Sequence, residues 1–597
     1  MLNEERQSVL GSYAVTGAWG RALHAALGRP VAVAAAVTAL VMLPGLGAAP
    51  WLDPPEGFHV EIAHEMAERG DWITPRLNGV RYFSKPPLPY WLMQLSFIPA
   101  GATPFAARLW PALAAVGAAA LTARLGSMLG GPRLGVLAGL MTGLNLGVFV
   151  FARIVKPDML LVLCITAAFT GLVAAYTTRR RWPLGVFYGA LGVAVIAKDI
   201  LGALGPLAVA AVFLWSVGER SLRTWVPWWG VVLFVAPWLP WYAAVEVRNP
   251  GFLWFTFVDV HLLNFAGRRA FPDEDVPLGT LEFLAVTAVA FLPWSLAVPF
   301  GAARTLSRGA AGDRVAATWR LHLLWVVAVI GVFAVSRFKL PHYAFPAFPA
   351  LALLAARAWD EAIGGGTGAR RLLVPSAVLF AVLAAAVVAA MAGALPMTRE
   401  ALETADLASR NATAHGRALD REPIGVPPGL LPPLAAVVVV ATGALAVAAW
   451  RRAAAAGAAV LIGATAAFLL VSGKGLEGVA SVRSAARIET ALLERLRPGD
   501  VVVHEGPLEN SASMLLRLRR PVPVVDGLQS NLAFGATFPD ARPLIWDRAQ
   551  LAEAWGAGTV FLVSVVAPER SAARELTPVT LVAAAAGRRL YTNFADR

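Results

Sequence analysis

The chain contains 597 residues, of which 57% are hydrophobic and 15% are charged. Soluble proteins carry about 25% charged residues, so this composition excludes a soluble globular protein and indicates a polytopic membrane protein. The net charge of +13 comes from arginines in short clusters between apolar segments, which is the positive-inside pattern and requires no nucleic-acid partner. The single cysteine, Cys164, excludes a disulfide within the chain.

Apolar segments long enough to cross a bilayer recur along the first 472 residues. A span needs about 20 apolar residues, and we expect about 13 spans. No cleavable signal is evident, and the first span is expected to remain uncleaved. The candidates are residues 31–48, 105–126, 131–150, 158–177, 182–197, 199–216, 224–243, 279–302, 319–335, 340–356, 372–395, 430–450 and 453–472.

The arginine clusters give the expected orientation. With the N-terminus in the cytoplasm, every inside loop carries basic residues. These are Arg124, Arg133, Arg179, Arg180, Arg181, Arg220, Arg223, Arg304, Arg308, Arg370, Arg371, Arg451 and Arg452. The remaining loops then lie outside, and they hold most of the polar side chains that chemistry requires.

The first outside loop, residues 49–104, has the most distinctive sequence. Residues 56–69 predict an amphipathic helix that Gly70 ends, with Phe58 on the apolar side and Glu61 on the polar side. Residues 87–101 are too short to span and begin with prolines, so we expect a second helix in the membrane interface. Counting them as a span would also move Arg179–Arg181 outside. The two helices predict the floor of a site at the membrane surface.

Residues 473–597 differ in character from the rest of the chain. Short apolar runs at 499–504, 521–526 and 559–566 predict buried strands, and helical patterns at 482–496 and 547–555 lie between them. This alternation is typical of a small α/β domain with a mostly parallel sheet. It has no glycine-rich phosphate loop, so we assign it no chemistry.

Acids, lysines and histidines gather on the outside face. Lysines bind phosphate as point charges, and carboxylates can activate an acceptor hydroxyl as general bases. The histidines show no HExxH or similar spacing, so a metal or other cofactor is not supported. The candidates are Asp53, Glu56, Lys85, Asp158, Lys198, His261, Lys339 and Tyr343.

Each candidate also has a purely structural interpretation. Asp53, Glu56 and Asp158 stand where an acid can cap a helix. Lys85 can extend to lipid headgroups, and His261 can be an ordinary packed histidine. Lys198 and Asp199 lie between two apolar runs, where ionisable groups are usually functional, although the two charges can also neutralise each other.

Residues 53–91 resemble the first periplasmic loop of bacterial aminoarabinose transferases of lipid A. These enzymes are part of the protein O-mannosyltransferase-like group of GT-C glycosyltransferases. The resemblance extends over roughly residues 30–360. Further matching residues are Pro157-Asp158-Met159, Ala197-Lys198, His261 with Gly267-Arg268, Leu292-Pro293-Trp294-Ser295, and Ser336 with Lys339-Leu340-Pro341-His342-Tyr343.

The resemblance implies an α-helical GT-C transmembrane domain over residues 1–472, including the periplasmic loop 49–104, and a periplasmic α/β domain over 473–597. It implies an inner-membrane enzyme, open to the periplasm, that inverts the anomeric carbon of a sugar carried by undecaprenyl phosphate. A loop-one acid (Asp53 or Glu56) and Asp158 are then the catalytic or acceptor-orienting carboxylates. The positions expected around the donor phosphate are Tyr82, Lys85, Lys198, His261, Lys339 and Tyr343.

The chain departs from the family pattern at three positions. Pro55-Glu56 stands where many relatives have Asp-Glu, Ser84 replaces a frequent acid, and Asp199 replaces a usual glycine. Our hypothesis is a glycosyltransferase whose acceptor is lipid A or lipopolysaccharide, with a protein or another envelope glycan as the alternative acceptor. A lipid-linked sugar transporter is disfavoured, because we find no internal repeat and the polar groups lie on one face.

Overall fold

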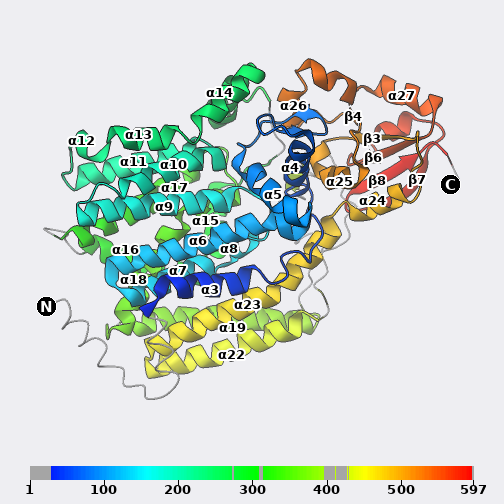
Figure 1. Cartoon of the computed structure of the whole chain (residues 1–597). Coiled ribbons are helices and arrows are strands. Elements are labelled where there is room, and N and C mark those ends of the chain that lie inside the picture. The colour runs from blue at the N-terminus through cyan, green and yellow to red at the C-terminus, as the bar shows by residue number, and fades with distance from the viewer. Residues whose placement is uncertain are drawn as a thin grey trace.

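The computed structural model describes residues 28–271, 275–307, 313–366, 368–394, 410, 411, 414, 427 and 429–594. Figure 1 shows a bundle of long helices that carries, at one end, two short helices of the first loop and the sheet of the C-terminal part. The α12 helix (Leu222–Trp225) lies at the opposite end of the bundle. This division matches the expected polytopic helical domain with a small α/β domain.

The helical bundle follows the apolar segments of the sequence. Among the residues that the structure describes, six helices are long and apolar enough to span a membrane, or up to eight if each of two bent pairs counts as one span. The predicted total of about 13 spans therefore remains a prediction. The six are α6 (Pro104–Gly130), α9 (Asp158–Thr178), α17 (Arg314–Val335), α19 (Ala369–Met391), α22 (Leu431–Arg451) and α23 (Ala454–Arg483).

Shorter and bent elements complete the bundle. The bent pairs are α13 (Trp228–Val235) with α14 (Leu239–Arg248), at 43°, and α15 (Thr280–Ala290) with residues Trp294–Ser307, at 108°. The second pair contains the 3₁₀ turn η2 (Trp294–Leu296) and α16 (Val298–Ser307). The other elements are α3 (Pro30–Met42), α7 (Pro132–Gly143), α8 (Leu146–Phe151), α10 (Leu184–Ala197), α11 (Leu201–Ser216), the π-helix η1 (Trp254–Leu263), the 3₁₀ segment η3 (Pro341–Ala347) and α18 (Phe348–Ile363).

Small residues let the bundle helices approach closely. The α6 helix ends at Gly131, whose φ of +87° favours glycine, and Pro132 starts α7. A Cβ added to Gly135 of α7 would lie 2.6 Å from the carbonyl oxygen of Ala123, and one added to Gly139 would lie 2.9 Å from that of Ala119. Such contacts are typical of helix packing in membranes.

The two helices expected in the first loop are present. The α4 helix (Gly57–Arg69) ends at Gly70 in the left-handed conformation, and α5 (Leu88–Ala100) follows the short hairpin of β1 (Arg76–Leu77) and β2 (Val80–Arg81). Ile62 and Met66 are buried as the apolar side of α4. Glu61 and Glu65 of the polar side are buried as well, and Glu65 accepts hydrogen bonds from the backbone of Gly79 in the hairpin. The 3₁₀ segment η4 (Leu508–Met514) also packs on α4.

The C-terminal part contains a six-stranded sheet in the order β5-β4-β3-β6-β8-β7. Four strands run parallel to one another: β3 (Val501–Glu505), β4 (Val524–Val525), β5 (Ile545–Trp546) and β6 (Val560–Ser564). The strand β8 (Arg588–Thr592) pairs antiparallel with both β6 and β7 (Thr580–Ala585). The helices around it are α24 (Ala486–Leu493), α25 (Leu515–Leu518), α26 (Leu532–Gly535) and α27 (Arg548–Ala557), with the 3₁₀ segments η5 (Pro539–Leu544) and η6 (Ala572–Glu575).

The sheet confirms the expected small α/β domain. The boundary expected at residues 472 and 473 falls inside α23, which continues to Arg483. We therefore use "tail domain" for residues 484–594. The segment after β3 meets α4, so the carboxyl end of the central strand faces the first loop.

Candidate functional site

The site is centred on Asp158, the first residue of α9, which is 3% exposed. The ammonium of Lys198 donates to Asp158 Oδ1 at 2.6 Å, and Nε2 of His342 lies 3.8 Å from the same oxygen. Lys198 follows the last residue of α10, and His342 comes from η3. Three segments far apart in the sequence therefore meet at one carboxylate.

Lys198 and Asp199 do not act as a self-neutralising pair. Lys198 pairs with Asp158, while Asp199 Oδ1 accepts a hydrogen bond from the backbone of Gly202 in the first turn of α11. Lys198 also lies over the ring of Tyr343, 5.4 Å from its centre. Tyr343 packs edge-on against His342 at 5.0 Å. The structure thus brings together three of the predicted residues, Asp158, Lys198 and Tyr343.

Two further lysines face this centre. Burial, followed by the positive charges of Lys85 and Lys156, holds the pKa of His59 well below its usual value, and Asp158 opposes this shift. His59 is therefore a neutral imidazole between cations and one carboxylate. The chain has five lysines, and three of them, Lys85, Lys156 and Lys198, converge here. Such an excess of positive charge suits an anionic ligand.

A small pocket adjoins the centre. His59, Lys156 and Pro157 line it together with an apolar wall of Pro89, Met93, Ala107, Trp110, Pro111, Val155 and Leu160. The ring of His59 is held by Tyr90, whose hydroxyl lies 3.2 Å from Nδ1. The pocket therefore combines hydrogen-bonding groups with an apolar surface, as small-molecule sites usually do.

Glu56 has a different environment. Its side chain is buried and accepts two hydrogen bonds from Arg108, at 2.8 and 2.6 Å. The backbone N–H groups of Leu52 and Val155 donate to its two oxygens at 2.9 and 3.0 Å. These four bonds use the four acceptor positions of a carboxylate. Glu56 does not cap α4 with its side chain, although it stands at the N-cap position.

Asp53 faces the tail domain rather than the pocket. Its carboxylate accepts hydrogen bonds from the Ser513 hydroxyl at 2.5 Å and from the backbone of Ser513 and Ala485. Burial raises the pKa of Asp53, although Arg588 and these hydrogen bonds act in the opposite direction. Asp53 thus joins the first loop to the tail domain.

The other predicted residues have contacts of their own. Lys339 donates to the carbonyl oxygen of Ser336 at 2.6 Å, at the end of α17. His261 Nδ1 lies 2.5 Å from the carbonyl oxygen of Thr256 within η1. Tyr82 is buried against Phe58 of α4, with ring centres 5.7 Å apart. Within the described residues, no three His, Cys, Asp or Glu side chains come together as a metal site.

Four residues at or near the site escaped our set of predicted site residues. Lys156 and His342 lie beside predicted residues in the same short motifs, so those motifs could have identified them as site residues. Arg108 is a charge inside an apolar segment, which by itself indicates a special role. His59 carried no such signal, because a histidine on an amphipathic helix is common.

Comparison with known proteins places these features in context. The sequence profile of the family described as dolichyl-phosphate-mannose-protein mannosyltransferase matches residues 53–256. The undecaprenyl phosphate-alpha-4-amino-4-deoxy-L-arabinose arabinosyl transferase 2 of Sodalis glossinidius is 31% identical over 310 residues, which cover 51% of this chain and 55% of that protein. The corresponding transferase of Pectobacterium carotovorum is 31% identical over 342 residues, 56% of this chain and 60% of that protein.

The match in three dimensions is more extensive. The crystal structure of ArnT from Cupriavidus metallidurans bound to undecaprenyl phosphate has a TM-score of 0.75 and 25% identity, covering 95% of this chain and 98% of that one. The sequence alignments span just over half the length of the curated relatives. The expected resemblance is confirmed: this chain is a multi-pass membrane protein that is similar to the aminoarabinose transferases in sequence and fold.

Proposed function

We propose that the protein is a glycosyltransferase that moves a sugar from a polyprenyl phosphate, undecaprenyl phosphate in particular, to an acceptor of the cell envelope. The observation that carries this proposal is the presence of Lys198 and Lys156 around the buried Asp158, with Lys85 acting on the neighbouring His59 and His342. One carboxylate among three lysines leaves net positive charge for a phosphate. The names of the similar transferases support the same donor.

The reaction follows from these charges. An acceptor oxygen attacks the anomeric carbon, the bond from that carbon to the phosphate oxygen breaks, and the electron pair leaves with the polyprenyl phosphate. The ammonium groups of Lys85, Lys156 and Lys198 stabilise the negative charge of this leaving group. Attack from the face opposite the phosphate inverts the anomeric configuration.

Asp158 is the carboxylate that we propose acts on the hydroxyl of the acceptor. Lys198 and His342 both approach Oδ1, so Oδ2 is the oxygen that accepts the acceptor's proton or orients its hydroxyl. Glu56 is unsuitable for this role because its acceptor positions are already used. Asp53 is engaged with Ser513 of the tail domain.

The remaining predicted residues have supporting roles in this proposal. Tyr343 forms part of the wall beside Lys198, and Tyr82 holds α4 from its buried position. The ammonium of Lys339 donates to a carbonyl oxygen at the end of α17, and this end precedes η3, which contains His342. His261 lies on η1 at the donor side. The neutral imidazole of His59 offers a hydrogen bond to a substrate oxygen in the pocket.

For the acceptor we propose lipid A or lipopolysaccharide, with the site facing the periplasm. The support is the resemblance to transferases named for 4-amino-4-deoxy-L-arabinose and the arginine clusters that predict the loop-one face to be outside. The alternative acceptor is a protein or another envelope glycan, since the matched family profile describes a protein mannosyltransferase.

Mass spectrometry of lipid A and other envelope glycans tests this function in cells with and without the protein. We expect a sugar to disappear from lipid A when the protein is absent, and its loss from another glycan would move the acceptor. The variant Lys85→Ala should abolish transfer while the protein still folds and inserts. Lys474→Ala, which changes an exposed lysine of α23, is the matched control and should transfer normally. No change on any glycan would contradict the proposal.

A further inference from the structure

Phe534 of the tail domain lies among aromatic rings that belong to two other parts of the chain. Its ring stacks on Phe255 of η1, with centres 4.4 Å apart and planes at 6°. It meets Phe271 edge-on at 5.5 Å and Phe83 edge-on at 5.8 Å. Offset and edge-on pairs of this kind stabilise an arrangement beyond the area that they bury. One side chain therefore contacts both ends of the segment 255–271 and the first loop.

The position of Phe534 is fixed by its neighbours. A Cβ added to Gly535 would lie 1.8 Å from the carbonyl oxygen of Arg81, so only glycine lets α26 approach β2 this closely. Asp540 then accepts ion pairs from Arg76 at 2.8 Å and Arg81 at 3.0 Å. Arg81 also lies over the ring of Phe538, 4.2 Å from its centre. These contacts therefore fix the position of the tail domain against the hairpin.

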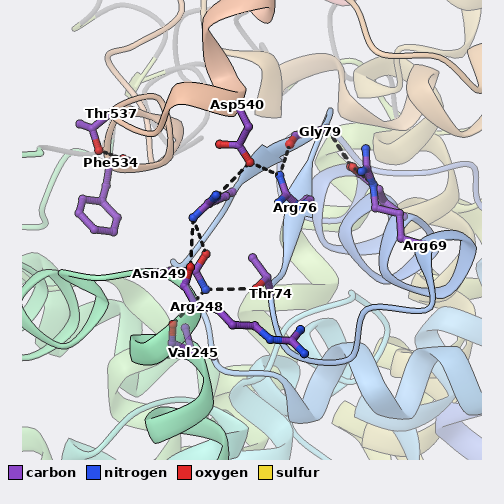
Figure 2. A network of polar contacts seen from close by, with 12 residues as sticks. Arg69, Thr74, Arg76, Gly79, Val245, Arg248, Asn249, Phe534, Thr537 and Asp540 are labelled. Atoms are coloured by element: carbon purple, nitrogen blue, oxygen red, sulfur yellow. Dashed lines mark hydrogen bonds and ion pairs between the residues drawn. The ribbon is translucent and has the colours of Figure 1, made fainter.

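The same network reaches the end of α14, as Figure 2 shows. Arg81 donates to Asn249 Oδ1 at 2.9 Å, and Asn249 donates from Nδ2 to the hydroxyl of Thr74 at 3.1 Å. Asn249 is buried and follows the last residue of α14, five residues before η1 begins. The hairpin, the end of α14 and the tail domain are thus held together by one set of polar contacts.

The segment between Phe255 and Phe271 has its own internal support. Asp259 is fully buried, pairs with Arg269 at 3.2 Å and accepts a hydrogen bond from the backbone of Ala270. This closes the segment into a loop whose two ends both touch Phe534. Its first part is a π-helix, a less regular conformation that frequently marks functional sites.

Two of the residues expected at the donor lie in segments that Phe534 contacts. His261 belongs to the segment 255–271, and Lys85 stands two residues after Phe83. Phe83 also packs against Phe252, with ring centres 5.3 Å apart. A shift of Phe534 would therefore reach Lys85 and the segment 255–271 at the same time.

We propose that Phe534 is a positioning residue through which the tail domain holds the segment 255–271 and the Lys85 segment after β2 in the conformation that binds the lipid phosphate. The inference rests on the proposed function and assigns the tail domain a part in assembling the donor site. Preorganising binding groups strengthens affinity because less ordering remains to be done when the ligand binds. A tail domain that served only to recognise an acceptor would need no such contacts with the donor side.

The test uses the full-length protein in lipid nanodiscs, with undecaprenyl phosphate as the probe. In Phe534→Ala we expect the dissociation constant for undecaprenyl phosphate to rise by about 10-fold and the amides of residues 255–271 to exchange hydrogen faster. The matched control is Phe594→Ala, which removes a tail-domain ring that pairs with Phe561 in the sheet. It should leave both quantities unchanged. Phe534→Leu, which keeps apolar bulk, should fall between wild type and Phe534→Ala.

A second variant covers the case in which Phe534→Ala does not fold. Asp540→Asn weakens the ion pairs with Arg76 and Arg81 at a partly exposed position and should change exchange and binding in the same direction. The inference is overturned if either folded variant binds and exchanges like wild type, or if Phe594→Ala has the same effect. Failure of wild type to bind undecaprenyl phosphate would instead defeat the proposed function, and the exchange measurement would still report on Phe534.

Discussion

Asp158 and Glu56 are both buried carboxylates beside a basic side chain, yet their surroundings differ. Glu56 is 0% exposed and has four hydrogen bonds from Arg108 and two backbone N–H groups. Asp158 is 3% exposed and is approached by Lys198 and His342 at one oxygen only. Lys156 adds positive charge beside Asp158, Lys85 adds it beside the neighbouring His342, and a pocket begins at Pro157.

The comparison distinguishes a structural acid from one that we propose to be catalytic by whether hydrogen bonds occupy all of its acceptor positions. Glu56 connects α4, α6 and the segment before α9, because its partners Arg108 and Val155 come from those parts of the chain. A carboxylate with every acceptor position occupied has nothing left for a substrate. Asp158 retains an oxygen and lies in an excess of positive charge. Burial alone would not have distinguished them.

The largest expected effect concerns the cation beside Asp158. Lys198→Ala removes the ammonium closest to that carboxylate and one of the charges that stabilise the leaving phosphate. We expect the transfer rate to fall by about 100- to 1,000-fold. Lys198→Arg should recover part of this loss because it keeps the charge with a different shape. Equal rates for Lys198→Ala and wild type would place the donor phosphate elsewhere.

Glu56→Gln should act on stability instead. The amide cannot neutralise the buried Arg108, and breaking a buried ion pair costs about 3–5 kcal/mol. Thermal unfolding of the full-length protein in detergent measures this loss. The control is Glu219→Gln, which breaks a half-exposed pair with Arg314 and should cost about 1 kcal/mol or less. Similar losses in both variants would contradict the structural role of Glu56.

Glu61 sharpens the comparison because it is a buried acid without a strong basic partner. Burial, followed by repulsion from Glu65 and Glu68, raises the pKa of Glu61 to about 9. Its folded-state pKa exceeds the unfolded value of about 4.3, so wild type loses stability as pH rises from about 4.3 to about 9. Glu61→Gln does not titrate and should be more stable by about 1–3 kcal/mol at pH 7.

Thermal unfolding of Glu61→Gln and wild type at several pH values checks this sign. The difference should be small at pH 5 and grow with pH until it levels off above pH 9. A difference that shrinks as pH rises would mean that Glu61 is charged and paired in the folded protein.

The smallest expected effect concerns Asp53. Ser513→Ala removes the hydroxyl that donates to its carboxylate at 2.5 Å. The backbone hydrogen bonds from Ser513 and Ala485 remain, so we expect a loss of about 1 kcal/mol. Transfer by the folded protein should be unchanged. A loss of transfer without a loss of stability would return Asp53 to the reaction centre.

The sequence predicted the parts of the fold that depend on local patterns. Apolar segments placed the long helices, and the combination of Phe58, Ile62 and Gly70 placed α4 and its end. Short apolar runs located β3, β4 and β6. These features follow from periodicity and from the conformational freedom of glycine. The burial of Glu61 escaped prediction because segments far away in the sequence, such as η4, pack on α4.

The candidate site was predicted less completely. Motifs identified Asp158, Lys198 and Tyr343 as single residues, whereas their pairing depends on how α9, α10 and η3 meet. The role of Lys339 at the phosphate stays a prediction, and in the structure its ammonium donates to carbonyl oxygens at the end of α17. A sequence does not show which partner a charged side chain will find across a bundle, and partners decide between structure and chemistry.

The central claim is that Asp158, and not Glu56, belongs to the reaction centre. The direct test measures the rate of sugar transfer per folded molecule in Asp158→Asn and Glu56→Gln, with the folded fraction of each determined in the same preparation. We predict at least a 100-fold loss for Asp158→Asn, about the lower end of the range for a general base, and a rate close to wild type for folded Glu56→Gln. Normal transfer by Asp158→Asn together with an inactive, fully folded Glu56→Gln would contradict the account.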